Sequence, residues 1–311
     1  MDRLTSMAVF VAAAEAGSLI AAARRFGLSA SMAGKHVSAI EAELNVRLMQ
    51  RSTRRLSLTE VGQAYYARCK RILEEFEDAN REASDTQHTV RGVLRAAAPV
   101  TFGAMHLGGV VARYLDQHPD VSVEIELNDR YVDLLAEGID VAIRIGRLHD
   151  SDLVARRLAP CRMLLCASPD FLASHGVPKD VEAVRRAPRL AFSQAVSAGD
   201  WTLTDPDGRS HAIDGPIRMA TNNTQMLLTA ALAGAGVTYG PSFVFGQHIA
   251  SGDLVALLPD HHTNDLAIHA VYPTARHVSL KLRRFIDHLV ASFGNAPPWD
   301  LVPTGKTPSK S

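Results

Sequence analysis

Cysteine is scarce in this chain of 311 residues, which has three: Cys69, Cys161 and Cys166. An odd and sparse set does not build a disulfide framework and is consistent with reduced thiols in a cytoplasm. No apolar run approaches the ~20 residues that a membrane span needs. The N-terminus lacks a basic segment followed by an apolar stretch and a cleavage site, so no secretory signal is expected. The sequence therefore predicts a cytoplasmic protein with no membrane partner.

Catalytic and metal-binding patterns are also missing. Cys161 and Cys166 have no second Cys/His pair at zinc-finger spacing, and a redox-sensing disulfide between them is the less common alternative to two buried thiols. Residues 260–265 hold two histidines and two aspartates, a stretch more often found as a solvated loop than as a metal site. No G-x-S-x-G, Walker A or G-x-G-x-x-G motif follows a strand in the correct context. We therefore expect neither an enzyme nor a resident metal or cofactor.

Net charge is absent as well, because 33 Lys and Arg are balanced by 33 Asp and Glu. The balance conceals a segregated arrangement. Residues 1–71 carry a net charge of +6, residues 72–88 a net charge of −5, and the remainder a net charge of −1. A charged, solvated helix face would explain part of this, but segregation over so short a stretch favours a polyanionic partner for the basic head.

A helical pattern begins the chain. Apolar residues at three- and four-residue steps predict a first helix that ends at Gly17. Ser18 can cap a second helix over residues 19–26, and Ser29 a third helix that ends near residue 44. Residues 27–29 form a tight turn between them, which is the pattern of a helix-turn-helix whose last helix can enter a major groove. On that helix the expected buried stripe is Ala33, Val37, Ile40 and Leu44, and the opposite face is Ser31, Gly34, Lys35 and Ser38.

A wing and a long helix follow. Leu48 and Met49 read as a strand, residues 50–55 as a basic tip and residues 56–58 as the returning strand. The tip arginines that can reach phosphate or the minor groove are Arg51, Arg54 and Arg55. The next helix carries a heptad seam typical of helix pairing, with packing on its own domain as the alternative. The seam consists of Tyr65, Cys69, Ile72, Phe76, Ala79 and Ala83.

Beyond a short hinge at residues 89–92, strands and helices alternate. Near-continuous apolar strands separated by helices predict parallel sheets covered by helices, here in two lobes. Ligands of such lobes bind beyond the carboxyl ends of strands, where helix starts can hold a carboxylate. Simple helix capping is an equally good explanation for Thr101 and Asn222. The candidate effector-binding residues are Thr101, Phe102, Arg144, Arg147, Phe192, Ser193, Asn222 and Asn223.

The stretch SLIAAARRFGLSASMAGKHVSAIEAELNVRLMQRSTRRLSLTEVGQAYY resembles the N-terminal domain of LysR-type transcriptional regulators. DRYVDLLAEGIDVAIRIGRLHDSDL resembles their effector domain, which is itself similar to periplasmic binding proteins. The resemblance places DNA contacts on residues 30–38 and on Arg54. Ala30 stands where a Gln is common and Gly34 where a Ser is usual, so base readout would depend on Ser31, Lys35, His36 and Ser38. It also implies a homotetramer and contact with RNA polymerase.

These features together predict an α/β protein that regulates transcription. The expected parts are a winged helix-turn-helix (1–58), a linker and dimerisation helix (59–88), a hinge (89–92), an effector domain (93–293) and a disordered tail (294–311). Lobe I is expected at about 93–161 and 268–293, and lobe II at about 162–267. The expected partners are double-stranded DNA, a second copy of the chain and a small-molecule effector, with an organic acid as the best guess. An enzyme or transport-type binding protein with a basic N-terminal domain is the alternative.

Overall fold

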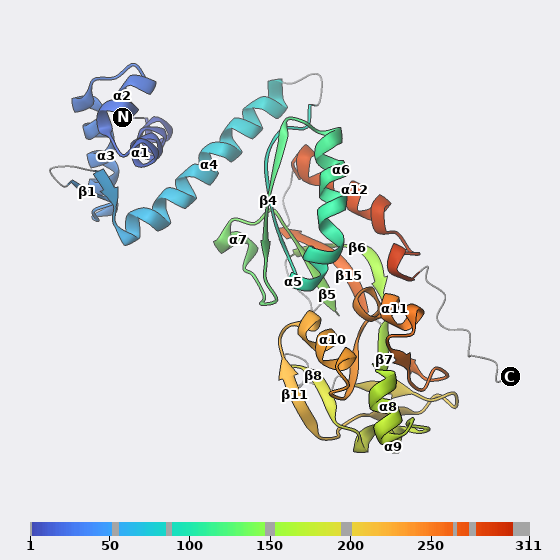
Figure 1. Cartoon of the computed structure of the whole chain (residues 1–311). Coiled ribbons are helices and arrows are strands. Elements are labelled where there is room, and N and C mark those ends of the chain that lie inside the picture. The colour runs from blue at the N-terminus through green and yellow to red at the C-terminus, as the bar shows by residue number, and fades with distance from the viewer. Residues whose placement is uncertain are drawn as a thin grey trace. The chain divides into compact units, whose positions relative to one another are not determined.

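The computed structural model describes residues 2–51, 56–84, 89–146, 153–193, 201–263, 266–273 and 278–300 (Figure 1). The chain separates into two compact units, Met1–Thr89 and Val90–Ser311, and each is described by itself. Among the described helices, none has the length and apolar character needed to cross a membrane.

The first unit is three short helices, a hairpin and one long helix. Side-chain caps explain where the three short helices begin, because Asp2, Ser18 and Ser29 each accept a hydrogen bond from a backbone N–H in the first turn. The hairpin is antiparallel, with Met49 opposite Leu58. In chain order the elements are α1 (Arg3–Ala16), α2 (Leu19–Arg25), α3 (Ala30–Leu44), β1 (Met49–Arg51), β2 (Leu56–Leu58) and α4 (Glu60–Ser84).

The core of this unit is continuous from α1 to the start of α4. Phe10, Ile40 and Leu48 are buried together, and Cys69 of α4 lies against them. Gly62 permits the close approach of α4 to β1, because a Cβ at that position would lie 1.9 Å from the carbonyl oxygen of Leu48. The hairpin, the helix-turn-helix and the first turns of α4 therefore form one packed body.

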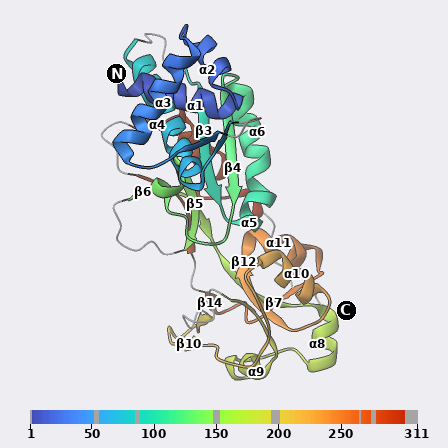
Figure 2. The ribbon, with the colours of Figure 1, turned by 90° about the vertical axis from the view of Figure 1, so that its left-hand side faces the viewer.

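The second unit contains two five-stranded sheets, one in each lobe (Figures 1 and 2). The strand order is β4-β3-β5-β15-β6 in lobe I and β11-β8-β12-β7-β13 in lobe II. The lobe I elements are β3 (Gly92–Ala98), α5 (Val100–Phe102), η1 (Gly103–Leu107), α6 (Gly108–Gln117), β4 (Val121–Leu127), α7 (Leu134–Glu137), β5 (Val141–Gly146), β6 (Leu153–Cys161), β15 (Leu266–Pro273), α12 (Leu280–Phe293) and η3 (Pro298–Asp300). The lobe II elements are β7 (Met163–Ala167), α8 (Pro169–His175), α9 (Val181–Arg186), β8 (Arg189–Phe192), β9 (Thr202–Thr204), β10 (Ser210–Ala212), β11 (Ile217–Thr221), α10 (Thr224–Leu232), β12 (Val237–Pro241), α11 (Ser242–Ser251), β13 (Val255–Ala256) and β14 (His262–Thr263).

The two faces of the lobe I sheet are covered differently. Helices α6 and α12 bury one face, where Tyr114 and Phe285 pack edge to face with ring centroids 5.1 Å apart. The opposite face has a small apolar cluster in which Leu134 of α7 covers Ala142 and Val271. The apolar cover of this face is therefore confined to the part near α7.

The segment after α12 is ordered, which corrects the expected disordered tail from residue 294. Trp299 is 8% exposed in a 3-10 turn, and its ring lies against Phe102, His106 and Phe293 of lobe I and Phe243 of lobe II. The burial of one indole supplies apolar contact that the Pro-rich composition of the stretch does not reveal. Residues 301–311 lie outside the described part of the chain.

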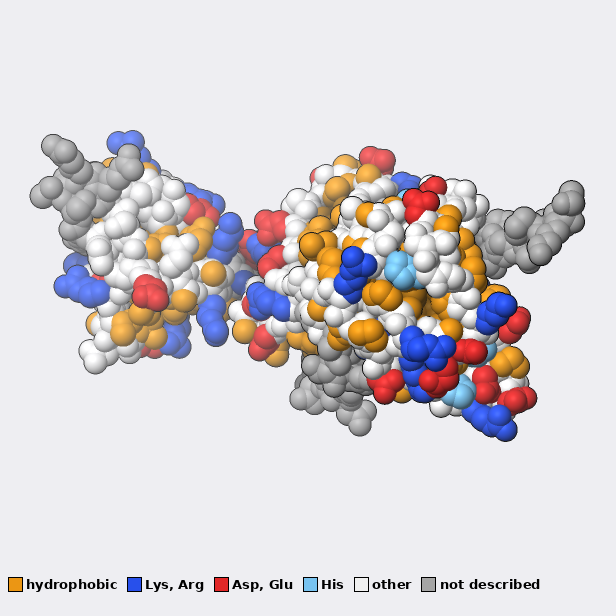
Figure 3. All heavy atoms as spheres, turned by 60° about the horizontal axis from the view of Figure 1, so that its bottom comes forward, with side chains coloured by type: hydrophobic (Ala, Val, Ile, Leu, Met, Phe, Trp, Pro, Cys, Tyr) orange, Lys and Arg blue, Asp and Glu red, His pale blue; other side chains and the backbone are white. Residues whose placement is uncertain are grey.

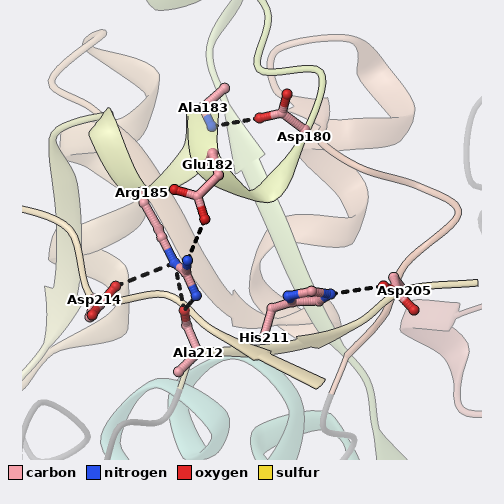
Figure 4. A network of polar contacts seen from close by, with 8 residues as sticks. All are labelled: Asp180, Glu182, Ala183, Arg185, Asp205, His211, Ala212 and Asp214. Carbon is pink, nitrogen blue, oxygen red and sulfur yellow. Dashed lines mark hydrogen bonds and ion pairs between the residues drawn. The ribbon is translucent and has the colours of Figure 1, made fainter. Parts of the chain in front are cut away.

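A small third sheet, β10-β9-β14, extends lobe II and is joined to α9 by a polar network (Figure 4). The Arg185 guanidinium donates to the carbonyl of Ala212 and pairs with the carboxylates of Glu182 and Asp214. His211, the neighbour of Ala212 on β10, has its Nε2 2.8 Å from Asp205 Oδ2. The network fixes the hairpin of β9 and β10 to the body of lobe II.

Candidate nucleic-acid interface and effector site

Helix α3 has one face available to a ligand. Ser31, Lys35 and Ser38 are exposed, and Gly34 between them is half-buried. The Ser29 hydroxyl accepts a hydrogen bond from Met32 N at 3.2 Å, which fixes the beginning of the helix. The face thus offers hydroxyls and one ammonium on a rigid helix. Figure 3 shows several Lys and Arg side chains and few acids on the visible side of the first unit.

His36 does not belong to that face, and its predicted contact with bases is wrong. It is 5% exposed, and its Nδ1 lies 2.9 Å from Ser6 Oγ of α1. The Ser6 hydroxyl already donates to the Asp2 carbonyl, so His36 Nδ1 is the donor of this bond. Its position three residues after buried Ala33 was the signal for burial. Leu44, expected in the buried stripe, is 38% exposed instead.

The Glu41 carboxylate of α3 is hydrogen-bonded to the backbone at the start of the wing. Glu41 Oε1 accepts hydrogen bonds from Leu48 N at 2.8 Å and from Met49 N at 3.0 Å. Hydrogen bonds to an ionised acceptor are among the stronger ones in proteins, so α3 and β1 move as one piece. The structure describes the strand backbone of Arg51, whereas its side chain, Arg54 and Arg55 lie outside the described residues. Glu41 is a positioning residue that the sequence analysis did not identify.

The predicted heptad seam of α4 divides into two parts. Tyr65 and Cys69 pack on the first unit itself, as the alternative interpretation held. Ile72 and Phe76, further along, are 45% and 42% exposed, and Ala79 is exposed. The side chain of Ala83 lies outside the described residues. The second half of α4 therefore exposes two large apolar residues, four positions apart, on a charged helix.

In lobe I the structure contradicts two of the predicted effector contacts. Phe102 is fully buried, and its ring lies 5.3 Å from that of Phe243. Thr101 is 7% exposed and does not cap α5, whose cap residue is Pro99. The Asp129 carboxylate instead accepts a hydrogen bond from Val100 N at 3.0 Å. A carboxylate of the chain therefore already occupies the helix start that was expected to hold an acidic effector.

Arg144 is directed to the loop before α7. Its Nη2 donates to the Val132 carbonyl at 3.1 Å, and its guanidinium lies over the Tyr131 ring, 4.6 Å from the centroid. Tyr131 is 71% exposed and was not predicted, although an exposed aromatic residue after a strand was a usable signal. Arg147 lies outside the described residues.

In lobe II the structure brings four predicted residues to one edge. Strands β8 and β11 are parallel, so their carboxyl ends lie at the same edge of the sheet. Phe192 ends β8 and is followed by Ser193, and Asn222 and Asn223 follow the last residue of β11. Ser193 N donates to the Thr221 carbonyl at 2.8 Å, which joins the two ends. Asn223 caps α10 by accepting from Met226 N, and Ser193 and Asn222 are exposed. Exposed hydroxyl and amide groups here are suited to bind a polar ligand. Over the part of the chain that is described, no group of three metal-ligating residues occurs.

A winged helix-turn-helix and a two-lobed α/β domain in one chain define a ligand-responsive DNA-binding regulator. Two family models agree with this class. Residues 4–63 match the bacterial regulatory helix-turn-helix protein model of the lysR family, and residues 87–294 match the LysR substrate binding domain. The chain belongs to the LysR family and is a DNA-binding transcriptional regulator with a substrate-binding effector domain.

Relatives of known name cover nearly the whole chain. It is 34% identical over 293 residues to the HTH-type transcriptional activator AaeR of Escherichia coli, covering 94% of each sequence. The structure of CrgA, a LysR-type transcriptional regulator from Neisseria meningitidis, matches with 31% identity and a TM-score of 0.61 over 94% of this chain and 99% of that chain. The full-length structure of the Vibrio cholerae virulence activator AphB matches with 26% identity and a TM-score of 0.59, over 94% and 99%.

Proposed function

We propose that α3 enters the major groove of an operator and reads base edges with Ser31, Lys35 and Ser38. The exposed, small and basic face of α3 carries this proposal, because a helix must approach the groove closely to contact bases. Gly34 in the centre of the face removes the side chain that would hold the backbone away. Glu41 supports the geometry by fixing α3 to the wing.

We infer that the wing adds contacts to the DNA backbone or minor groove through Arg51, Arg54 and Arg55. Guanidinium groups bind phosphate without reading sequence, so the wing would supply affinity and orientation while α3 supplies specificity. The net charge of +6 on residues 1–71 supports a polyanionic partner.

We propose that two chains pair through the second half of α4, with Ile72, Phe76, Ala79 and Ala83 along the seam. A charged helix that exposes two large apolar side chains in heptad register supports pairing with a second copy. In this assignment residues 1–58 are the DNA-binding domain, 59–88 the dimerisation helix, 89–92 the hinge and 93–293 the effector domain. Assembly of two dimers into a tetramer, contact with RNA polymerase and a cytoplasmic location complete the proposal.

We infer that the effector is a small organic acid held at the lobe II edge by Ser193 and Asn222, with Phe192 as an apolar wall. Arg147, which follows β5 in the sequence and lies outside the described residues, would neutralise the acid. Arg144 is not included at the lobe II edge, because its guanidinium is directed to the Val132 carbonyl and the Tyr131 ring within lobe I. A ligand that bound one arrangement of the lobes more tightly would shift the population of DNA-binding assemblies.

The DNA-binding proposal is tested by a salt titration of the full-length chain on an operator selected from random duplexes. Binding is expected to weaken steeply with salt, and Arg54→Ala in the wing should lower the magnitude of the log–log slope by about 1, because it removes a phosphate contact. Lys179→Ala, an exposed lysine of the second unit, is the matched control and should leave the slope unchanged. Absence of duplex binding at low salt would contradict the proposal.

The effector proposal is tested with a panel of short-chain and aromatic carboxylic acids added to the protein–operator complex. At least one acid should change operator affinity for the wild type, and the Ser193→Ala, Asn222→Ala double variant should lose that response. Ser174→Ala, an exposed serine of lobe II, serves as the control. A double variant that responds like the wild type would remove these residues from the effector site.

A further inference from the structure

Three nitrogen-bearing side chains form a transverse row on the lobe I sheet. In the register of the antiparallel strands, His269 of β15 lies opposite Arg144 of β5 on one side and opposite Arg157 of β6 on the other. Directly opposed residues of antiparallel strands point to the same face of a sheet. The three side chains therefore share the face that carries α7, beyond the edge of its apolar cluster.

The two arginines of this row form no ion pair with any acid of the described residues. Within the described ranges no carboxylate lies within ion-pair distance of Arg144 or Arg157. Glu124, Glu126 and Glu137 lie at the other end of the face, and two of them are paired, because Glu124 bonds Arg95 at 3.1 Å and Glu137 bonds Arg130 at 2.9 Å. The β5-β15-β6 half of the face is thus left with an excess of positive charge.

His269 between them has an unused hydrogen-bonding atom. Its Nδ1 is buried, and among the described residues it has no partner with good hydrogen-bond geometry, only a weaker backbone contact of the ring with Ala267. Burial, and then the nearby Arg157 charge, lower the pKa of His269 below its usual value, so the imidazole is neutral at neutral pH. Buried polar atoms in proteins are nearly always hydrogen-bonded. We therefore expect His269 Nδ1, which lies between the two arginines, to form a hydrogen bond with a ligand.

The next row of the same face is made of small residues. Ala267 lies opposite Gly146 on β5 and opposite Pro160 on β6, and all three are half-buried. These three residues are too short to cover the neighbouring row of Arg144, His269 and Arg157. The exposed Tyr131 ring on Arg144 adds an apolar edge at the end towards α7.

We propose that the Arg144–His269–Arg157 row binds a small organic dianion of the dicarboxylate class. The two arginines are separated by two strand spacings, about 10 Å between Cα atoms, a span over which flexible guanidinium stems can converge on two carboxylates. A long polyanion such as DNA does not fit, because the exposed acid Glu126 and the Glu137 carboxylate stand on the same face. This site is separate from Ser193 and Asn222, and neither proposal depends on the other.

The test is isothermal titration of the full-length chain with succinate, glutarate and adipate at low ionic strength. Arg157→Gln removes one charge of the row. Arg156→Gln is the matched control, since Arg156 is the next residue of β6, is also exposed and faces the other side of the sheet. Unliganded thermal unfolding compares the folding of the two variants.

We expect at least one dicarboxylate to bind the wild type and the Arg156→Gln variant equally, and to bind Arg157→Gln about tenfold or more weakly. Butyrate should bind the wild type about tenfold more weakly than the best dianion. Failure of all three dicarboxylates to bind the wild type would overturn the proposal, as would equal weakening in both variants. Binding that survives in Arg157→Gln but is lost in Asn222→Ala would belong to the lobe II edge and would overturn it too.

Discussion

Helix α3 and the start of the helical segment after β3 present their side chains in opposite ways. On α3, exposure follows helical periodicity: Ala33, His36, Val37 and Ile40 are buried, while Lys35 and Ser38 are exposed. At the carboxyl end of β3, Thr101 and Phe102 are both buried, and the rings of Trp299 and Phe243 cover Phe102. Exposure on a surface helix is thus a local property, whereas exposure at a strand end depends on what distant segments place over it. Substitutions at the two places test this difference.

The largest effect is expected where α4 approaches the backbone of Leu48, the residue before β1. Gly62→Val would place a Cβ 1.9 Å from the Leu48 carbonyl, a contact that only backbone displacement can relieve. We expect the first unit to lose about 4 kcal/mol of its free energy of unfolding, together with operator binding, because overpacking against a main chain cannot be relieved by a rotamer change. Chemical denaturation measures the loss.

Gly108→Ala is the control for this substitution. Gly108 lies in a helix, and a Cβ there would meet nothing within 4 Å. Its replacement should be neutral or stabilise by up to about 1 kcal/mol, since Ala favours a helix. Equal unfolding free energies for Gly62→Val and the wild type would show that α4 and the hairpin are not packed as one body.

The second prediction concerns Trp299, which covers Phe102 at the carboxyl end of β3. Trp299→Ala removes the ring that contacts Phe102, His106 and Phe293, so we expect a loss of about 3 kcal/mol from the second unit. Its indole Nε1 has no hydrogen-bond partner within the described part of the chain, so Trp299→Phe should cost less than about 1.5 kcal/mol. Thermal unfolding compares the two. An unchanged Trp299→Ala transition would mean that distant cover does not decide burial at this strand end.

The third prediction concerns Glu41, which links α3 to the wing. Glu41→Gln keeps the shape but replaces the charged acceptor of Leu48 N and Met49 N with a neutral one, at an expected cost of about 1 kcal/mol. Glu43→Gln, two residues later, changes the same charge but removes only an exposed ion pair with Arg3, and should cost less. Denaturant midpoints of the two variants decide the order. A larger loss from Glu43→Gln would refute the tie between α3 and the wing.

The extent of correct prediction follows the same distinction. The family, the helix-turn-helix and the two-lobed α/β fold follow from periodicity and from long stretches of resemblance. His36 was misplaced because its polar ring outweighed its helical position next to Val37. Burial of Phe102 involves Trp299, which lies almost 200 positions away in a Pro-rich stretch without any periodic pattern. The Arg144–His269–Arg157 row depends on strand register, which joins residues far apart in the chain and has no local signature.

The smallest effect is expected at the lobe II hairpin, where Asp205→Asn removes a surface charge. The hydrogen bond from His211, followed by that from Arg209 N, lowers the pKa of Asp205 below its usual value. A lowered folded-state pKa gives stability that is present above the unfolded pKa, about pH 4, and is lost as the pH falls through the folded-state value. The variant should therefore be less stable than the wild type at neutral pH, and the difference should vanish in acid.

Asp207→Asn removes the same charge but only an exposed ion pair with Arg209, so its deficit at neutral pH should be smaller. A deficit for Asp205→Asn that persisted unchanged in acid would show that packing, rather than the ionised carboxylate, holds the hairpin.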